Sequence, residues 1–310
     1  MHTAGMAVTS LLFGASSMLG WSILQGAIRE GVAVSAFCNG NTRVLPAGAS
    51  HRIDLDEEAA VEELFRTIDP PSLIIHCAGV CDVADCERSP EFAQAANVDA
   101  TRFLIAHAPP TARIVYCSSD HVFGGDAGPY FEDSPPAPIS VYGRTRVEAE
   151  AMVRARANTL VIRSGLWIGP SGNGRIGHLD WLRSRHSRNL PMTVVSDEVR
   201  SAVWAEDAAA RVWQLARSTV VGTRHITATR AIDRPALAAF VNAHFAIGAT
   251  FDTALRATRN APHLGNVELA TRYDDALAAP LASPIEAFTG TPTPASRASL
   301  PPAPRSARST

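Results

Sequence analysis

The chain has 310 residues, 46% of them hydrophobic, and a formal net charge of −2. A chain of this length can form one large α/β domain or two smaller domains. The small net charge gives no electrostatic footprint for nucleic acid or acidic membranes, and no apolar run approaches the roughly 20 residues that span a bilayer. We therefore expect a globular protein that acts on a small molecule, with neither nucleic acid nor a membrane as partner.

The N-terminal segment and the cysteines indicate a cytoplasmic protein. Residues 6–20 (MAVTSLLFGASSMLG) lack the basic segment that opens a signal peptide, and their glycine turn fits a buried strand entering a helix. An odd count of five cysteines argues against a secreted disulfide framework. Three cysteines cluster at positions 77, 81 and 86 without the second cysteine pair of a zinc site, so we expect buried or loop thiols and no metal site.

Strands and helices alternate in the first half of the chain. Continuous apolar runs predict strands over 8–16, 32–37, 72–79, 112–119 and 159–165. Helical spacing predicts helices over 18–31, 59–68, 91–108 and 144–157. Apolar strands separated by helices are typical of a parallel sheet covered on both faces. We predict an α/β fold, a Rossmann-type doubly wound parallel sheet, with an NAD(P)-binding domain over residues 1–165.

The pattern loosens after residue 166. A glycine-rich loop at 169–177 is followed by short predicted strands at 192–197 and 222–228 and by predicted helices at 179–185, 205–217 and 234–245. We assign 166–288 to a smaller C-terminal substrate lobe, with some elements returning to the sheet. Residues 289–310 are rich in Pro, Ser and Ala and cannot bury enough apolar surface to fold, so we predict a disordered tail.

A glycine-containing turn follows the first predicted strand. The segment GASSMLG runs from Gly14 to Gly20 and leads into a helix, where exposed N–H groups can receive a pyrophosphate. Ser17 stands where a middle glycine is usual. We expect this turn to bind a nucleotide through Gly14, Ser16, Ser17, Met18, Leu19 and Gly20; a purely structural glycine turn is the alternative.

The residues after the second predicted strand bear on the choice of cofactor. No carboxylate stands there to bind the ribose 2′-OH of NAD, whereas Asn39 and Arg43 are available for a 2′-phosphate. This favours NADP(H) over NAD(H), unless Arg43 is merely a solvated loop residue. Asp54, with Leu55 beside it, can accept a hydrogen bond from an adenine amino group. The small residues Cys77, Ala78 and Gly79 would let a dinucleotide lie across the sheet edge.

Tyr142, Ser119 and Arg146 form a candidate catalytic set. In carbonyl reduction a phenol gives a proton to the carbonyl oxygen as hydride reaches the carbon, a hydroxyl orients that oxygen, and a cation lowers the pKa of the phenol from about 10. The usual spacing is Tyr-x-x-x-Lys, and here Arg146 holds the lysine position. The chain contains no lysine at all, so all 28 basic residues are arginine. Arg146 is therefore weak evidence of inactivation.

Residues 118–150 resemble the active-site segment of extended short-chain dehydrogenases/reductases. Within them they are most similar to dTDP-4-dehydrorhamnose reductases and to the related regulatory beta subunit of methionine adenosyltransferase, and segments 11–21, 74–87 and 258–269 add to this resemblance. The resemblance implies that Ser119 is the orienting hydroxyl, Tyr142 the acid and Arg146 the lysine equivalent. It further implies that Asn97 lies along the cofactor and that the substrate side includes Ser118, Asp120, His121, Leu166, Trp167 and Arg200.

Three departures from the family pattern lie on the substrate side. His121 stands where tyrosine is usual, Leu166 where tryptophan is expected, and RSAVW (200–204) lacks the expected proline and threonine. Two hypotheses follow. The first is an NADPH-dependent reductase of a keto group, possibly on a nucleotide-linked sugar. The second is a catalytically silent NADP-binding regulatory subunit that docks on a partner enzyme; a homodimer is also open.

Overall fold

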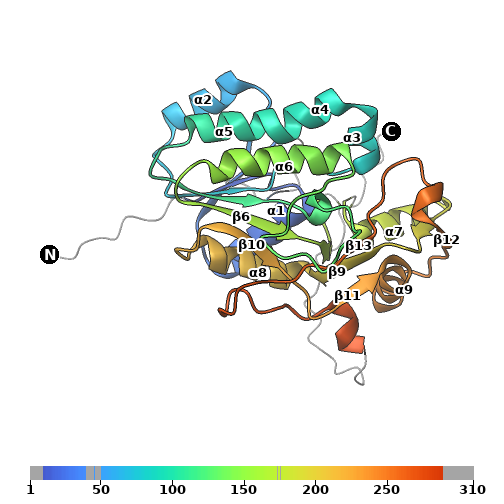
Figure 1. The fold of residues 1–310 in the computed structure, drawn as a ribbon. Coiled ribbons are helices and arrows are strands. Elements are labelled where there is room, and N and C mark those ends of the chain that lie inside the picture. Colours follow the sequence, from blue (N-terminus) through green and yellow to red (C-terminus); the bar gives the residue numbers. More distant parts are fainter. Residues whose placement is uncertain (1–9, 40–44, 46–49, 173, 175, 289–310) are drawn as a thin grey trace, which may run out of the picture.

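The computed structural model describes residues 10–39, 45, 50–172, 174 and 176–288. A seven-stranded sheet forms the centre of the molecule, in the order β10-β6-β5-β4-β1-β2-β3, and every adjacent pair is parallel (Figure 1). The strands are β1 (Ser10–Phe13), β2 (Val34–Cys38), β3 (Ser50–Arg52), β4 (Leu73–His76), β5 (Arg113–Cys117), β6 (Thr159–Ser164) and β10 (Gly222–Ile226). The predicted doubly wound α/β fold is confirmed.

Helices cover both faces of this sheet (Figure 1). One face carries α2 (Glu58–Thr67), α5 (Ala100–His107) and α6 (Val141–Arg154). The short helices α3 (Val83–Arg88) and α4 (Pro90–Gln94) lie between α2 and α5 in the chain. The other face carries α1 (Met18–Arg29) and α8 (Ala205–Ala216). Alternate residues of β1 enter different cores, because Leu12 packs with α1 and α8 while Leu11 and Phe13 pack under α2 and α5.

Some boundaries differ from the sequence prediction. The helix predicted from residue 144 begins at Val141, because Ser140 caps it by accepting a hydrogen bond from Gly143 N at 3.0 Å. The helix predicted over 91–108 is interrupted by a π-helical turn, η2 (Ala95–Asp99). The edge strand β3 was not predicted, since three residues are too few for a periodic signal. Arg43 and the predicted tail at 289–310 lie outside the described residues.

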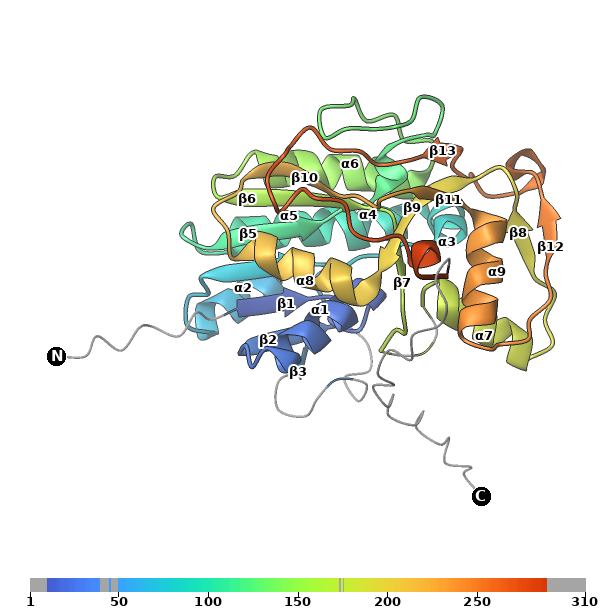
Figure 2. The same ribbon diagram turned by 90° about the horizontal axis from the view of Figure 1, so that it is seen from below.

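The chain after β6 builds a second group of strands beside the carboxyl ends of the main sheet (Figure 2). β9 (Val199–Trp204) pairs with β7 (Leu166–Ile168), β11 (Ala231–Asp233) and β13 (Asn266–Val267). β8 (Thr193–Val195) pairs with β12 (Asp252–Ala254), and α7 (His178–Ser187) and α9 (Arg234–His244) pack nearby. The short 3₁₀ turns are η3 (Asp120–Val122), η4 (Arg256–Thr258) and η5 (Pro284–Phe288). Both α8 and β10 return to the main sheet. No helix among the described residues is long and apolar enough to cross a membrane.

Candidate active site

A cavity of about 1030 Å³ lies at the carboxyl ends of the central strands. Its position beside β1 and β4 is the point where strand order reverses, the usual ligand position in open α/β sheets. From the residues predicted to contact the cofactor, the cavity wall includes Gly14, Ser16, Ser17, Asn39, Asp54, Leu55, Ala78 and Gly79. From the predicted substrate residues it includes His121, Leu166 and Arg200.

The turn after β1 is built on two glycines. Gly14 has a φ of +84°, and a Cβ there would lie 2.5 Å from Ala78 N. A Cβ on Gly20 would lie 2.2 Å from Gly14 O, so α1 packs directly on the turn. Ser17 caps α1 by accepting a hydrogen bond from Gly20 N at 3.0 Å. Ser17, the N-cap of α1, lines the cavity, so the N-terminus of the helix lies beside it, a position that suits an anion.

Other residues predicted for the cofactor lie behind the cavity wall. Asn97 is fully buried, and its side chain accepts from Val80 N at 2.9 Å and donates to Val80 O at 3.1 Å and Thr145 Oγ1 at 2.9 Å. It thereby fixes the loop after β4, whose residues 78–84 line the cavity. Met18, Leu19, Gly20 and Cys77 are not part of the lining either.

Tyr142 lies in the first turn of α6, next to the turn that carries Ser119. α6 can approach this turn closely because residue 143 is glycine: a Cβ there would lie only 2.2 Å from His121 O. The rings of His121 and Tyr142 meet edge to face, with centroids 5.2 Å apart. Tyr142 is 6% exposed and does not itself line the cavity, whereas its ring neighbour His121 does.

Two opposing effects act on the pKa of Tyr142. Burial raises the pKa of the phenol and outweighs the charge of Arg146 and a hydrogen bond with Ser119, which both lower it. Arg146 thus lowers the pKa of the phenol, as the sequence predicted, but burial raises it by more and the net shift is upward. Burial also brings the pKa of His121 well below its ordinary value, so this imidazole is neutral.

Arg146 lies one helical turn after Tyr142 and is buried behind Gly79. Its Cζ is 5.2 Å from the centre of the Tyr142 ring, and its Nη1 donates to Tyr116 Oη at 2.8 Å. A Cβ on Gly79 would lie 2.6 Å from Arg146 Nη2. Burial lowers the pKa of the guanidinium, but Tyr116 and Tyr142 together raise it by more. The net shift is therefore upward, and Arg146 stays protonated. Burial raises the pKa of Tyr116 to about 12.

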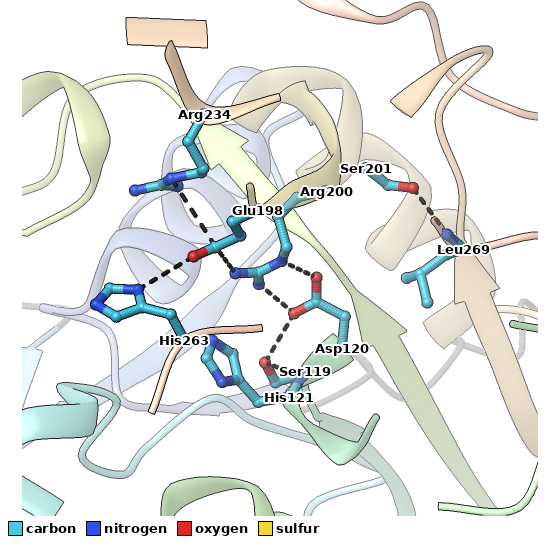
Figure 3. Close-up of polar contacts among 9 residues, drawn as sticks. All are labelled: Ser119, Asp120, His121, Glu198, Arg200, Ser201, Arg234, His263 and Leu269. Atoms are coloured by element: carbon cyan, nitrogen blue, oxygen red, sulfur yellow. Dashed lines mark hydrogen bonds and ion pairs between the residues drawn. The ribbon is translucent and has the colours of Figure 1, made fainter. Parts of the chain in front are cut away.

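A buried network of charges stands on the substrate side (Figure 3). The carboxylate of Asp120 accepts hydrogen bonds from Arg200 Nε, at 2.6 Å, and from Arg200 Nη2. Arg200 Nη1 donates to Glu198 at 2.9 Å. Glu198 also contacts His263 Nδ1 at 3.2 Å and Arg234 Nε at 3.9 Å. Two carboxylates thus face two guanidinium groups.

The remaining predicted substrate residues lie away from the cavity wall. Trp167 packs in the core between α8 and the sheet, and Ser118 Oγ donates to the buried Glu150 at 2.6 Å. The wall instead contains Glu198, Arg234, His263 and Trp181, which we did not predict. His263 lies within the 258–269 segment that we had noted, and Glu198 stands two residues before RSAVW; Arg234 and Trp181 carry no comparable signal.

The fold and the cavity define a Rossmann-type α/β protein with a cavity at the carboxyl edge of its parallel sheet, where such folds usually bind ligands. The chain belongs to the family described as RmlD substrate binding domain, whose model matches residues 8–310. The dTDP-4-dehydrorhamnose reductase of Mycobacterium tuberculosis strain H37Rv is 30% identical over 228 residues, 71% of this chain and 69% of the relative. Methionine adenosyltransferase 2 subunit beta of Xenopus tropicalis is 34% identical over 151 residues, 46% of this chain and 42% of the relative.

Solved structures agree with the fold. The dTDP-4-dehydrorhamnose reductase of Bacillus anthracis, in complex with NADP, has a TM-score of 0.75 at 20% identity, covering 92% of this chain and 98% of that one. MoeE5 in complex with UDP-glucose and NAD has a TM-score of 0.72 at 20% identity, covering 85% and 90%. At this level of identity the likeness establishes the architecture and leaves the chemistry to the residues of the site.

Proposed function

We propose that this protein is an NADPH-dependent reductase of a keto group on a nucleotide-linked sugar, like dTDP-4-dehydrorhamnose reductase. The observation that carries the proposal is that Tyr142, Ser119 and Arg146 meet directly behind the wall of a cavity that begins at the Gly14 turn. Reductase relatives that cover about 70% of the chain support it.

The cavity has groups that fit a nicotinamide dinucleotide. The turn from Gly14 to Ser17 and the first turn of α1 suit the pyrophosphate, and Asp54 and Asn39 suit the adenosine end. When bound, NADPH would supply the hydride. We infer a preference for NADP(H) because no carboxylate stands between the end of β2 and Asp54. NAD(H) is the alternative, and the structures in complex with NADP and with NAD support the nicotinamide class in general.

The side chains of this protein would then handle the proton. Tyr142, neutral because burial raises its pKa, donates its phenolic proton to the substrate oxygen, and Ser119 orients that oxygen. Arg146 stabilises the phenolate that forms but does not release a proton near neutral pH. Arg146 therefore cannot return the proton to the phenol, and reprotonation would have to come from solvent.

The test is oxidation of NADPH by a panel of dTDP-4-keto sugars. Substrate-dependent loss of the nicotinamide absorbance is expected, falling about 10²–10⁴-fold in Tyr142→Phe. Tyr273→Phe is the matched control, because Tyr273 is 40% exposed and lies outside the cavity lining. Equal loss in both variants would contradict the assignment of Tyr142.

The second candidate is a catalytically silent NADP-binding regulatory subunit. It is favoured by the hydrogen bond that directs Arg146 towards Tyr116 and by the likeness to methionine adenosyltransferase 2 subunit beta. Under this alternative NADPH binds tightly and no sugar of the panel oxidises it. Arg146→Lys, which restores the family residue, would then leave the protein inactive.

A further inference from the structure

Asp120 ties the hydroxyl of Ser119 to the second group of strands. Its side chain is fully buried in η3, and Ser119 Oγ donates to Asp120 Oδ1 at 3.3 Å. The same carboxylate accepts hydrogen bonds from two nitrogens of Arg200, which lies on β9, as Figure 3 shows. Ser119 Oγ also accepts from His121 N at 3.2 Å. Its donor and one of its acceptor sites are therefore fixed by η3 itself.

Each nitrogen of the Arg200 guanidinium has a protein partner. Its Nε and Nη2 meet Asp120, and its Nη1 meets Glu198, whose carboxylate is held in turn by His263 and Arg234. The side chains of Arg200, Asp120 and Glu198 are each at most 6% exposed. Although Arg200 borders the cavity, its hydrogen-bonding capacity is directed at the protein, so we do not assign it to a ligand.

We infer that Arg200 is a positioning residue, which holds the Ser119 hydroxyl against Tyr142 by clamping Asp120. The planar guanidinium fixes both carboxylate oxygens at once, and this sets the rotation of the Asp120 side chain. With that rotation fixed, the Ser119 hydroxyl is held beside the phenol of Tyr142, with which it makes a hydrogen bond. A point charge at position 200 would preserve the attraction but not the rotation.

The clamp also links two parts of the molecule that are distant in sequence. Asp120 follows β5 of the main sheet, whereas Arg200 lies on β9, which pairs with β7, β11 and β13. Displacement of β9 would therefore reach Ser119 through one ion pair. The effect of Arg200 on turnover rests on the proposed function, whereas its effect on the Tyr142 environment does not.

The test is a double-mutant cycle between Arg200→Lys and Ser119→Ala. Arg200→Lys should lower kcat about tenfold or more with little change in the KM for NADPH, because it misplaces a catalytic hydroxyl. In the Ser119→Ala background the same substitution should change kcat by no more than about twofold. Equal losses in the two backgrounds would overturn the inference and leave Arg200 as a structural residue. Asp120→Asn provides a second arm with the same expected coupling.

A fluorine NMR arm keeps the inference testable if no sugar is reduced. The protein is labelled with 3-fluorotyrosine, and the Tyr142 resonance is assigned by its loss in Tyr142→Phe. Arg200→Lys should shift this resonance when Ser119 is present and leave it unchanged in Ser119→Ala. An equal shift in both backgrounds, or none in either, would contradict the clamp. Absence of turnover with a coupled shift would refute the proposed function alone.

Discussion

The ion pair between Glu150 and Arg163 gives the sharpest prediction of stability. Glu150 lies on α6 with a side chain that is fully buried, and Arg163 of β6 is 3% exposed. Arg163 donates to both carboxylate oxygens, Nε at 2.9 Å and Nη2 at 2.7 Å. Arg163→Met removes the buried cation and leaves the carboxylate with Ser118 and Arg154. We expect a loss of about 3–5 kcal/mol in the free energy of unfolding, as for other broken buried pairs.

Arg154→Met is a matched control because Arg154 pairs with the same carboxylate from the surface. Its Nη1 lies 2.8 Å from Glu150 Oε2, and its side chain is 36% exposed. The expected loss is below about 1 kcal/mol, since exposed ion pairs contribute little. Both variants make the same change, keeping an apolar stem and removing the guanidinium, so the contrast isolates burial of the charge.

Equilibrium unfolding in urea, followed by tryptophan fluorescence, measures both losses. The double variant Glu150→Gln with Arg163→Met should recover part of the stability lost by Arg163→Met, because the carboxylate that lost its buried cation is then replaced by a neutral amide. If Arg163→Met and Arg154→Met cost the same, or if the double variant is less stable than Arg163→Met, the reasoning is refuted.

Three further predictions concern the turn, a buried histidine and the partner of the catalytic arginine. Gly14→Ala should destabilise the protein by about 1–3 kcal/mol and weaken NADPH binding in fluorescence titration. Gly31→Ala is the control, because Gly31 also has a positive φ but has no neighbour within 4 Å, and it should leave NADPH binding intact. Equal losses of binding in the two variants would contradict a role for the close contact between Gly14 and Ala78. Burial lowers the pKa of His76 to about 3, so the stability that its neutral form contributes is present above pH 6.5 and is lost as pH falls towards 3. Urea unfolding at pH 7 and at pH 5 should show a fall in the free energy of unfolding that is smaller by about 2 kcal/mol in His76→Phe. An equal fall in the variant and the parent protein would refute this. Tyr116→Phe should leave Tyr142 as the phenol nearest to the Arg146 guanidinium and so lower the pKa of Tyr142. The alkaline limb of the pH profile of kcat/KM should then move to lower pH. An unchanged limb would exclude an effect of Tyr116 on the pKa of Tyr142.

The sequence predicted the sheet because its strands are buried on both faces. Runs such as 72–79 and 112–119 are apolar throughout, and the glycine turn after β1 marks the switch point of the sheet. The start of α6 was missed by three residues, because the cap at Ser140 is a local hydrogen bond that the periodic pattern does not record.

The candidate site could be predicted only where it lies in continuous motifs. Tyr142 and Arg146 meet because they are four residues apart on one helix, and Ser119 joins them because β5 and α6 are adjacent. The bond from Arg146 to Tyr116 and the contact of Glu198 with Arg234 join residues 30 and 36 positions apart in unrelated elements. No spacing rule predicts such pairs, since they depend on how the strands after β6 pack against the main sheet.

Transfer of deuterium from NADPD tests the central claim most directly. The protein is incubated with 4-deuterated NADPD and a dTDP-4-keto sugar, and the sugar product is analysed by mass spectrometry and NMR. We predict one deuterium on the carbon that carried the keto group, with transfer retained in Tyr273→Phe and lost in Tyr142→Phe. Tight NADPD binding without deuterium in any sugar of the panel would contradict the reductase and favour the silent subunit.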